Sequence, residues 1–174
     1  CKGLQLVELV DLVQVTELSA LASLTGLQHL IIQFQSLHLK IADLSPLSAC
    51  TDLRTLELHG LCSVADLSPL TACKGLQDLV LDALLKVTDI TALAPLTGLQ
   101  HLSIVMCDVQ DLSPLSQCTG LQVLELMMTS SDLADLSPLT TCARLQQLVL
   151  FELVSVTDIS FLAVLPQLRS LKLH

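Results

Sequence analysis

Leucine and other aliphatic residues recur along the whole chain with the spacing L-x-x-L-x-L. An acidic residue opens each repeat, often within the sequence DLSPL, and aliphatic residues follow it after ten, thirteen and fifteen positions, as at Leu53, Leu56 and Leu58. The repeats open at Glu17, Asp43, Asp66, Asp89, Asp111, Asp135 and Asp158, so successive openings lie 26, 23, 23, 22, 24 and 23 residues apart. A period of this length is typical of a solenoid built from stacked repeats.

Each segment predicts one β-strand, because its last two aliphatic residues alternate with a variable one. One repeat is too short to bury its own apolar side, so neighbouring repeats are expected to stack into a parallel sheet. Counting back one repeat to Leu4, Val7 and Leu9 gives about eight strands. Glycine precedes five of them, which favours a turn with positive φ, at Gly3, Gly26, Gly75, Gly98 and Gly120.

The other side of each repeat is predicted to be a short turn. Serine is expected as the N-cap, with proline at the first helical position, at Ser45-Pro46, Ser68-Pro69, Ser113-Pro114 and Ser137-Pro138. Only about six residues follow before the next turn, which favours a short helical or 3₁₀ turn. The opening acidic residue recurs in every repeat, whereas a catalytic acid is needed once, so it is predicted to hold the turn.

These repeats resemble those of the leucine-rich-repeat family, over essentially the whole chain. The DLSPL blocks are similar to internalin-like repeats, and the Val87-Thr88-Asp89 turn and the cysteine before the strand are similar to cysteine-containing repeats. The resemblance implies an α/β fold, a right-handed solenoid or horseshoe. Its concave face would carry a parallel sheet of about eight strands, and its convex face short helical or 3₁₀ turns.

Residues 1–174 are expected to form a single solenoid of about seven repeats. Neither end carries a cap sequence, which indicates a longer solenoid or other polypeptide over the ends. The family places Asn, Cys or Thr three residues after the last strand leucine, where its side chain satisfies loop backbone groups. Here that position holds Leu61, Leu84 and Cys107, among others, so an asparagine ladder is absent and the partners of those groups stay open.

Composition narrows the class of partner. Leucine accounts for 45 of the 174 residues and aromatic residues for only 2%, so one side-chain shape fills the core. The net charge of −9, from 8 Lys and Arg against 17 Asp and Glu, argues against nucleic acid or an anionic membrane as the main partner. Polar residues interrupt every apolar run before the roughly 20 residues that a membrane-spanning helix needs, so no membrane insertion is expected.

The chain has seven cysteines, and the repeat tests what four of them do. Cys50, Cys73, Cys118 and Cys142 all lie seven residues after a repeat opening, where other repeats have leucine, such as Leu96. This exchange predicts an apolar core position rather than a metal site, which would need four thiolates at one point. The odd total favours a reducing compartment, and a cell-surface or secreted location is left open.

The histidines and carboxylates form no recognisable catalytic arrangement. His29 and His101 are expected on one sheet face but three strands apart, about 14 Å, too far to share a metal ion. No spacing typical of a catalytic triad, a zinc-protease helix or a phosphate-binding loop occurs. We therefore expect no enzyme activity, no catalytic residue, no metal and no cofactor.

The outward strand positions vary from repeat to repeat and are predicted to bind a partner. A polar centre is expected at Glu57, His59 and Asp82, with Asp78 beside it. An apolar stretch over three adjacent strands is expected from Val105, Met106, Val123, Met127, Met128, Val149 and Phe151. Exposed apolar residues in one patch usually mark an interaction site. The alternative is that another structural element or a neighbouring chain covers them.

The favoured function is a non-catalytic protein–protein interaction module that binds a protein partner on the concave sheet face. Two alternatives stay open at this point. One is a structural segment of a large assembly, in which this face is permanently filled. The other is the substrate-recognition arm of a multi-domain protein such as a ubiquitin ligase.

Overall fold

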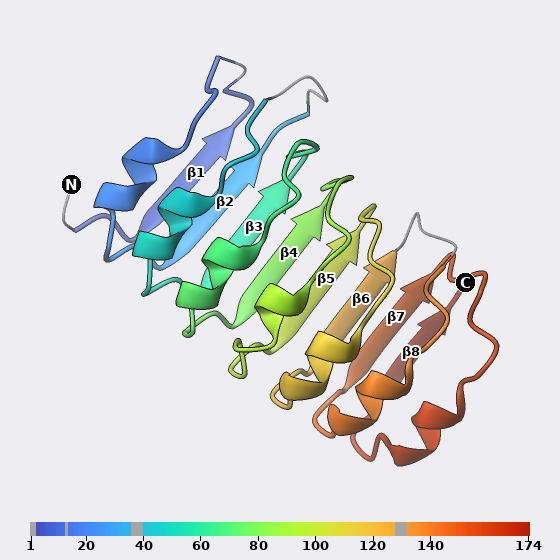
Figure 1. Cartoon of the computed structure of the whole chain (residues 1–174). Coiled ribbons are helices and arrows are strands. Elements are labelled where there is room, and N and C mark those ends of the chain that lie inside the picture. The colour runs from blue at the N-terminus through green and yellow to red at the C-terminus, as the bar shows by residue number, and fades with distance from the viewer. Residues whose placement is uncertain (1–2, 13, 36–39, 128–131) are drawn as a thin grey trace.

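Eight short strands form one open parallel sheet, in which each strand pairs with the next along the chain (Figure 1). The computed structural model describes residues 3–12, 14–35, 40–127 and 132–174. The strands are β1 Leu6–Val10, β2 His29–Gln33, β3 Thr55–His59, β4 Asp78–Asp82, β5 His101–Val105, β6 Val123–Met127, β7 Gln147–Phe151 and β8 Ser170–Leu173. The predicted parallel sheet and its strands are confirmed.

Register stacks the leucines of consecutive repeats. Leu56 and Leu58 of β3 pair with Leu79 and Leu81 of β4, and all four side chains are buried. The residues between them face the other way and are half-buried, the alternation expected for a sheet with one covered face. Because the register continues unchanged through the sheet, like positions of different repeats form straight rows across it.

Short 3₁₀ turns make the second layer and cover one face of the sheet (Figure 1). They are η1 Ser19–Ser23, η2 Ser45–Ala49, η3 Ser68–Ala72, η4 Thr91–Leu93, η5 Ser113–Gln117, η6 Ser137–Thr141 and η7 Ser160–Val164. The predicted short turns on the convex side are confirmed. The chain is a right-handed solenoid with its sheet on the concave face.

The N-cap prediction was wrong by one residue. Serine is the first residue of the four 3₁₀ turns that contain Ser-Pro, and the preceding leucine, Leu44 in η2, is the N-cap and offers no side-chain acceptor. The acceptor is the opening aspartate: the Ser45 backbone N–H donates to Asp43 Oδ1 at 2.7 Å, and the Ser45 hydroxyl donates to Oδ2 at 2.9 Å. The carboxylate reaches forward two residues, as in other Asx turns. These hydrogen bonds lower the pKa of Asp43, which confirms the turn-holding role predicted for the opening acidic residue.

The glycine prediction was also wrong. Gly75, Gly98 and Gly120 do not have positive φ, and the left-handed position instead follows the strand, at Gly60 with φ 75° and Ala83 with φ 57°. Close packing explains Gly120, since a Cβ there would lie 3.2 Å from the carbonyl oxygens of Thr97 and Leu99. Glycine marks a close approach of neighbouring repeats at this point rather than a special φ.

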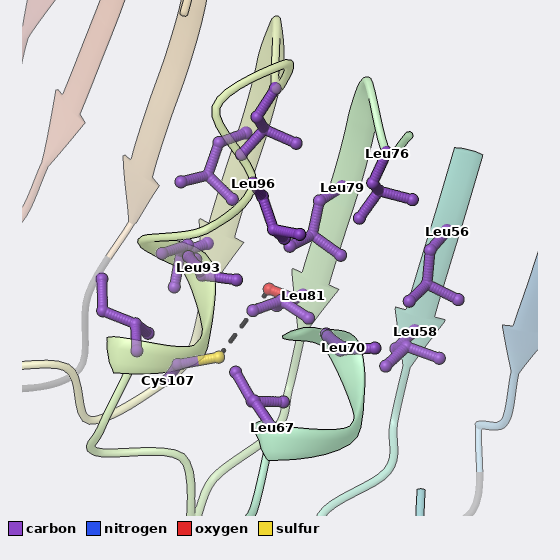
Figure 2. Packing of buried hydrophobic residues seen from close by; sticks show 14 of the residues in the cluster. Leu56, Leu58, Leu67, Leu70, Leu76, Leu79, Leu81, Leu93, Leu96 and Cys107 are labelled. Atoms are coloured by element: carbon purple, nitrogen blue, oxygen red, sulfur yellow. Dashed lines mark hydrogen bonds between the residues drawn. The ribbon is translucent and has the colours of Figure 1, made fainter. Parts of the chain in front are cut away.

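The loop after each strand finds its backbone partners in the next repeat. The Gly60 N–H donates to Asp82 O at 2.9 Å, and the Ala83 N–H donates to Val105 O at 2.9 Å. Leu61 and Leu84, at the position of the missing asparagine, are fully buried instead. Cys107, at the same position, donates from Sγ to Leu81 O at 3.7 Å (Figure 2). Backbone hydrogen bonds between neighbouring repeats therefore satisfy many of the loop groups that an asparagine ladder would otherwise pair.

The core is one continuous cluster of leucines with cysteines set between them. Figure 2 shows the part of this cluster that surrounds Cys107. Cys50, Cys73, Cys118 and Cys142 are fully buried, as is Leu96 at the equivalent position, so their predicted core role is confirmed. Burial raises the pKa of the Cys73 and Cys118 thiols to about 11. These thiols stay protonated at neutral pH.

The two outer strands have apolar side chains in contact with solvent. The inward Leu171 and Leu173 of β8 are 40% and 46% exposed, and the inward Val7 and Leu9 of β1 are only partly buried, whereas the inward leucines of β3 and β4 are inaccessible. That residues 1–174 form one solenoid without caps stays a prediction. Across the described ranges, every helical element is too short to cross a bilayer.

Candidate functional site

The side chains at the first, third and fifth positions of the strands point away from the 3₁₀ turns. We call this surface the open face. It lies on a backbone held by pairing on both sides of β2–β7, so its side chains are fixed relative to one another. Most are half-buried, and none of them is needed to fill the leucine core.

The polar part of the open face is centred on His59. Its Nδ1 lies 3.1 Å from Asp82 Oδ2 on β4, and its Nε2 lies 3.3 Å from Glu57 Oε2 on its own strand. A neutral imidazole has one N–H, so both contacts are hydrogen bonds together only in the imidazolium form. Next to this cluster, His101 Nδ1 lies 3.8 Å from Asp78 Oδ1. The structure brings Glu57, His59 and Asp82 together as predicted.

The apolar part of the open face lies on β5, β6 and β7. Register places Val105, Met127 and Phe151 side by side in the fifth-position row. Met127 is 37% exposed. The Phe151 ring also packs against His174, with ring centroids 5.3 Å apart.

The other predicted residues lie around this row. Val123 and Val149 lie on the open face but flank Glu125, which therefore divides the apolar residues. Met106 follows β5 in the turn, with φ 52° and 47% exposure, and so lies at the rim. Met128 lies outside the described residues.

Two features of the open face escaped the sequence prediction. Glu125 accepts hydrogen bonds from Gln147 Nε2 at 3.3 Å and from Ser103 Oγ at 3.5 Å, which makes a polar island within the apolar part. The residue just before the strand is glutamine in six of eight repeats: Gln5, Gln28, Gln77, Gln100, Gln122 and Gln146. Gln122 Nε2 donates to Gln100 Oε1 at 3.4 Å. The recurrence of glutamine at this repeat position was the sequence signal that could have predicted this row of side-chain amides.

The open face offers a binding surface of polar and apolar side chains. In the described ranges, no group of three His, Cys, Asp or Glu side chains is placed to hold a metal ion. His29 and His101 lie on β2 and β5, three strands apart as predicted.

Solved structures with the same architecture identify the family. Internalin C2 from Listeria monocytogenes is 30% identical to this chain, with a TM-score of 0.84 over 99% of this chain and 72% of that protein. The chain belongs to the leucine-rich-repeat family. Searches of family profiles and of curated proteins find no match to this sequence.

More distant structures of leucine-rich-repeat architecture share the fold alone. Internalin F from Listeria monocytogenes is 23% identical with a TM-score of 0.64, and this chain spans 99% of its own length and 62% of that protein. The plant peptide hormone receptor RGFR1, solved in complex with RGF2, is 16% identical with a TM-score of 0.60, over 87% of this chain and 29% of the receptor. The leucine-rich-repeat assignment, with internalin-like repeats, is confirmed. In general terms this is the fold of a protein-interaction module.

Proposed function

We propose that this leucine-rich-repeat chain is a non-catalytic module that binds a protein partner on its open face. One observation supports the proposal above all: Val105, Met127 and Phe151 stand in one row on three adjacent strands and face away from the core. Solvent-facing apolar side chains gathered in this way usually mark an interaction site. The chemistry of Met and Phe suits it, because both bring large apolar area to a contact.

The fold supplies the second argument. A concave parallel sheet presents many side chains at fixed spacing without using any of them for stability. The receptor RGFR1 was solved in complex with RGF2, so a protein of this architecture is known to hold a peptide. The same use is proposed here for Glu57, His59 and Asp82 and for the apolar row.

The test compares variants of the open face. Phe151→Ala and Met127→Glu should each weaken partner binding by about 2 kcal/mol or more, as truncation of a central contact does. Partners captured by the wild-type chain and lost by both variants are then titrated by calorimetry. Glu8→Ala, on β1 at the far end of the same face, is the matched control and should change the affinity little.

Thermal melts serve as the folding control, since none of these side chains belongs to the leucine core. Equal affinities for wild type, Phe151→Ala and Met127→Glu would move the binding site elsewhere. Collapsed melts would instead show that these side chains support the fold.

A further inference from the structure

Negative charge on the open face has almost no basic counterpart. Its outward strand positions carry five carboxylates, Glu8, Glu57, Asp78, Asp82 and Glu125, and Lys172 is the single Lys or Arg among them. The chain has 8 Lys and Arg in total, so the rest lie elsewhere. Charge is therefore distributed unevenly over the surface, and the proposed binding face is acidic.

Among the described residues, histidines are the only basic side chains within ion-pair distance of the carboxylates in the middle of the face. Glu57 and Asp82 share His59, and Asp78 faces His101 at 3.8 Å. From the described residues, Glu125 accepts hydrogen bonds from Gln147 and Ser103, both neutral donors. In the part of the chain that the structure describes, no Lys or Arg comes within ion-pair distance of these four carboxylates. Their charge is available to a cation from outside the chain.

The acidic and apolar parts meet in one row. Asp82 pairs with Val105, Val105 with Met127, and Met127 with Phe151, so the fifth-position row changes from a carboxylate to a phenyl ring over three strand steps. Three steps of about 4.8 Å make about 14 Å. An extended polypeptide covers that distance in about four residues.

We infer that the open face takes a basic segment of a protein partner with an apolar anchor about four residues from its cationic side chain. The cation would lie over Glu57, Asp78 and Asp82, and the anchor over Val105, Met127 and Phe151. Arginine fits best, because its planar guanidinium can pair with two carboxylate oxygens. This inference rests on the proposed function and adds the chemical class of the partner. An acidic or nucleic-acid partner would meet repulsion on the same surface.

Synthetic peptides of about ten residues provide the probe, because their charge and anchor can be changed singly. The first has two arginines and, four positions on, one phenylalanine in a Gly-Ser background. The second replaces Arg with Glu, and the third replaces Phe with Ser. Fluorescence anisotropy should give an affinity for the first peptide at least about tenfold above that of either other. That affinity should fall as sodium chloride rises from about 50 to about 300 mM, since salt screens exposed charges.

A matched pair of variants assigns the effect to the open face. The triple variant Glu57→Gln, Asp78→Asn, Asp82→Asn should lose about tenfold in affinity for the first peptide. The control variant Asp52→Asn, Asp108→Asn, Glu152→Gln removes the same charge from positions outside the open face and should lose less than about twofold. Asp78→Asn alone gives a milder version of the test. The new amides keep an acceptor oxygen for His59, and like charges on neighbouring strands are relieved, so the melting temperature should change little.

Equal affinity for the Arg and Glu peptides, or an unchanged affinity in the triple variant, would overturn the inference. A different result would contradict the proposed function: Phe151→Ala would leave the capture of partners intact. Partners captured through Phe151 but insensitive to salt and to the triple variant would keep the open face as the site and make its partner class wrong. A dimer of the chain that Phe151→Ala abolishes would make a second copy the occupant, and would also overturn the inference.

Discussion

At the scale of single residues, buried cysteines replace leucines without breaking the column of repeats. Cys50 donates from Sγ to Leu21 O at 3.5 Å, and Cys118 donates to Leu93 O at 3.5 Å, each a carbonyl of the preceding repeat. A thiol is small, apolar and a weak donor, so it suits a position beside both leucine side chains and a backbone carbonyl. The cysteines are thus structural, and their chemistry should be suppressed.

Thiol labelling tests this directly. Cys73, Cys107 and Cys118, with pKa values raised by burial to about 11, should react slowly with a thiol reagent at pH 8 and fully after unfolding. Cys62, which is half-buried, should react faster and is the internal control. Because the folded pKa is raised, stability should be complete below about pH 9 and fall as pH rises towards 11. Rapid native labelling of the buried thiols would contradict their structural role.

Replacement of Cys118 by serine tests the same site energetically. Cys118→Ser should lower the free energy of unfolding by about 1–3 kcal/mol, because a hydroxyl loses water in an apolar site. Cys62→Ser, at a partly exposed position, should cost less. Urea titration measures the free energy of unfolding of both variants. Equal decreases would show that burial of the cysteine does not determine how much the substitution destabilises the chain.

At the scale of the element, each repeat depends on two turns that differ in chemistry. The turn after β1, β3, β4, β5 and β7 has a left-handed residue, which is glycine at Gly60 but alanine at Ala83. The turn before the 3₁₀ element needs a carboxylate two residues ahead of its first N–H, as Asp89 provides for Thr91. Side-chain and backbone hydrogen bonds from Thr91 lower the pKa of Asp89.

Exchange of glycine and alanine at equivalent turns should have unequal effects on stability. Gly60→Ala should destabilise by more than about 2 kcal/mol, since φ is 75° and the new Cβ would fall 1.9 Å from Phe34 O. Ala83→Gly relieves a strained φ of 57° but adds freedom to the unfolded chain, so its stability should change by less than about 1 kcal/mol. Thermal melts compare the two. A mild effect of Gly60→Ala would mean that this turn can rearrange.

The opening aspartates should govern stability in acid. The pKa values of Asp43, Asp89, Asp135 and Asp158 are lowered by hydrogen bonds to the turn, so their contribution is complete above the ordinary value of 3.8. It is lost as pH falls through the lower folded values. Asp89→Asn with Asp158→Asn keeps an acceptor but does not titrate, and should flatten the dependence of melting temperature on pH between about 5 and 2. An unchanged profile would assign acid unfolding to other carboxylates.

The strands and the core could be predicted because two periods are visible in the sequence. Apolar residues alternate every two residues within a strand, and the whole pattern repeats about every 23 residues. The turn chemistry could not be placed to the residue. A left-handed turn accepts Ala83 and Met106 as well as Gly60, so glycine does not locate it. The caps were misplaced because a carboxylate reaches over one residue to the N–H of Ser45, which no spacing rule distinguishes from capping by serine itself.

At the scale of the whole molecule, stacking converts repeat positions into rows across one face. Rows of leucine hold the fold together, and the variable rows form the open face. Sequence alone indicated that Glu57, His59 and Asp82 gather and that Val105, Met127 and Phe151 align, since strand pairing follows from the repeat. The place of Met106 at the rim and the hydrogen bonds of Glu125 depend on backbone and side-chain geometry that the pattern does not encode.

The proposed function requires above all that partners contact the open face. Methyl NMR of methionine tests it directly, because the chain has only 3 Met and Met127 lies in the fifth-position row of the open face. The signals are assigned with Met106→Leu and Met127→Leu. Titration with a captured partner should shift or broaden the Met127 methyl signal in step with binding. A partner that saturates the chain while the Met127 signal stays unchanged would contradict binding on this face.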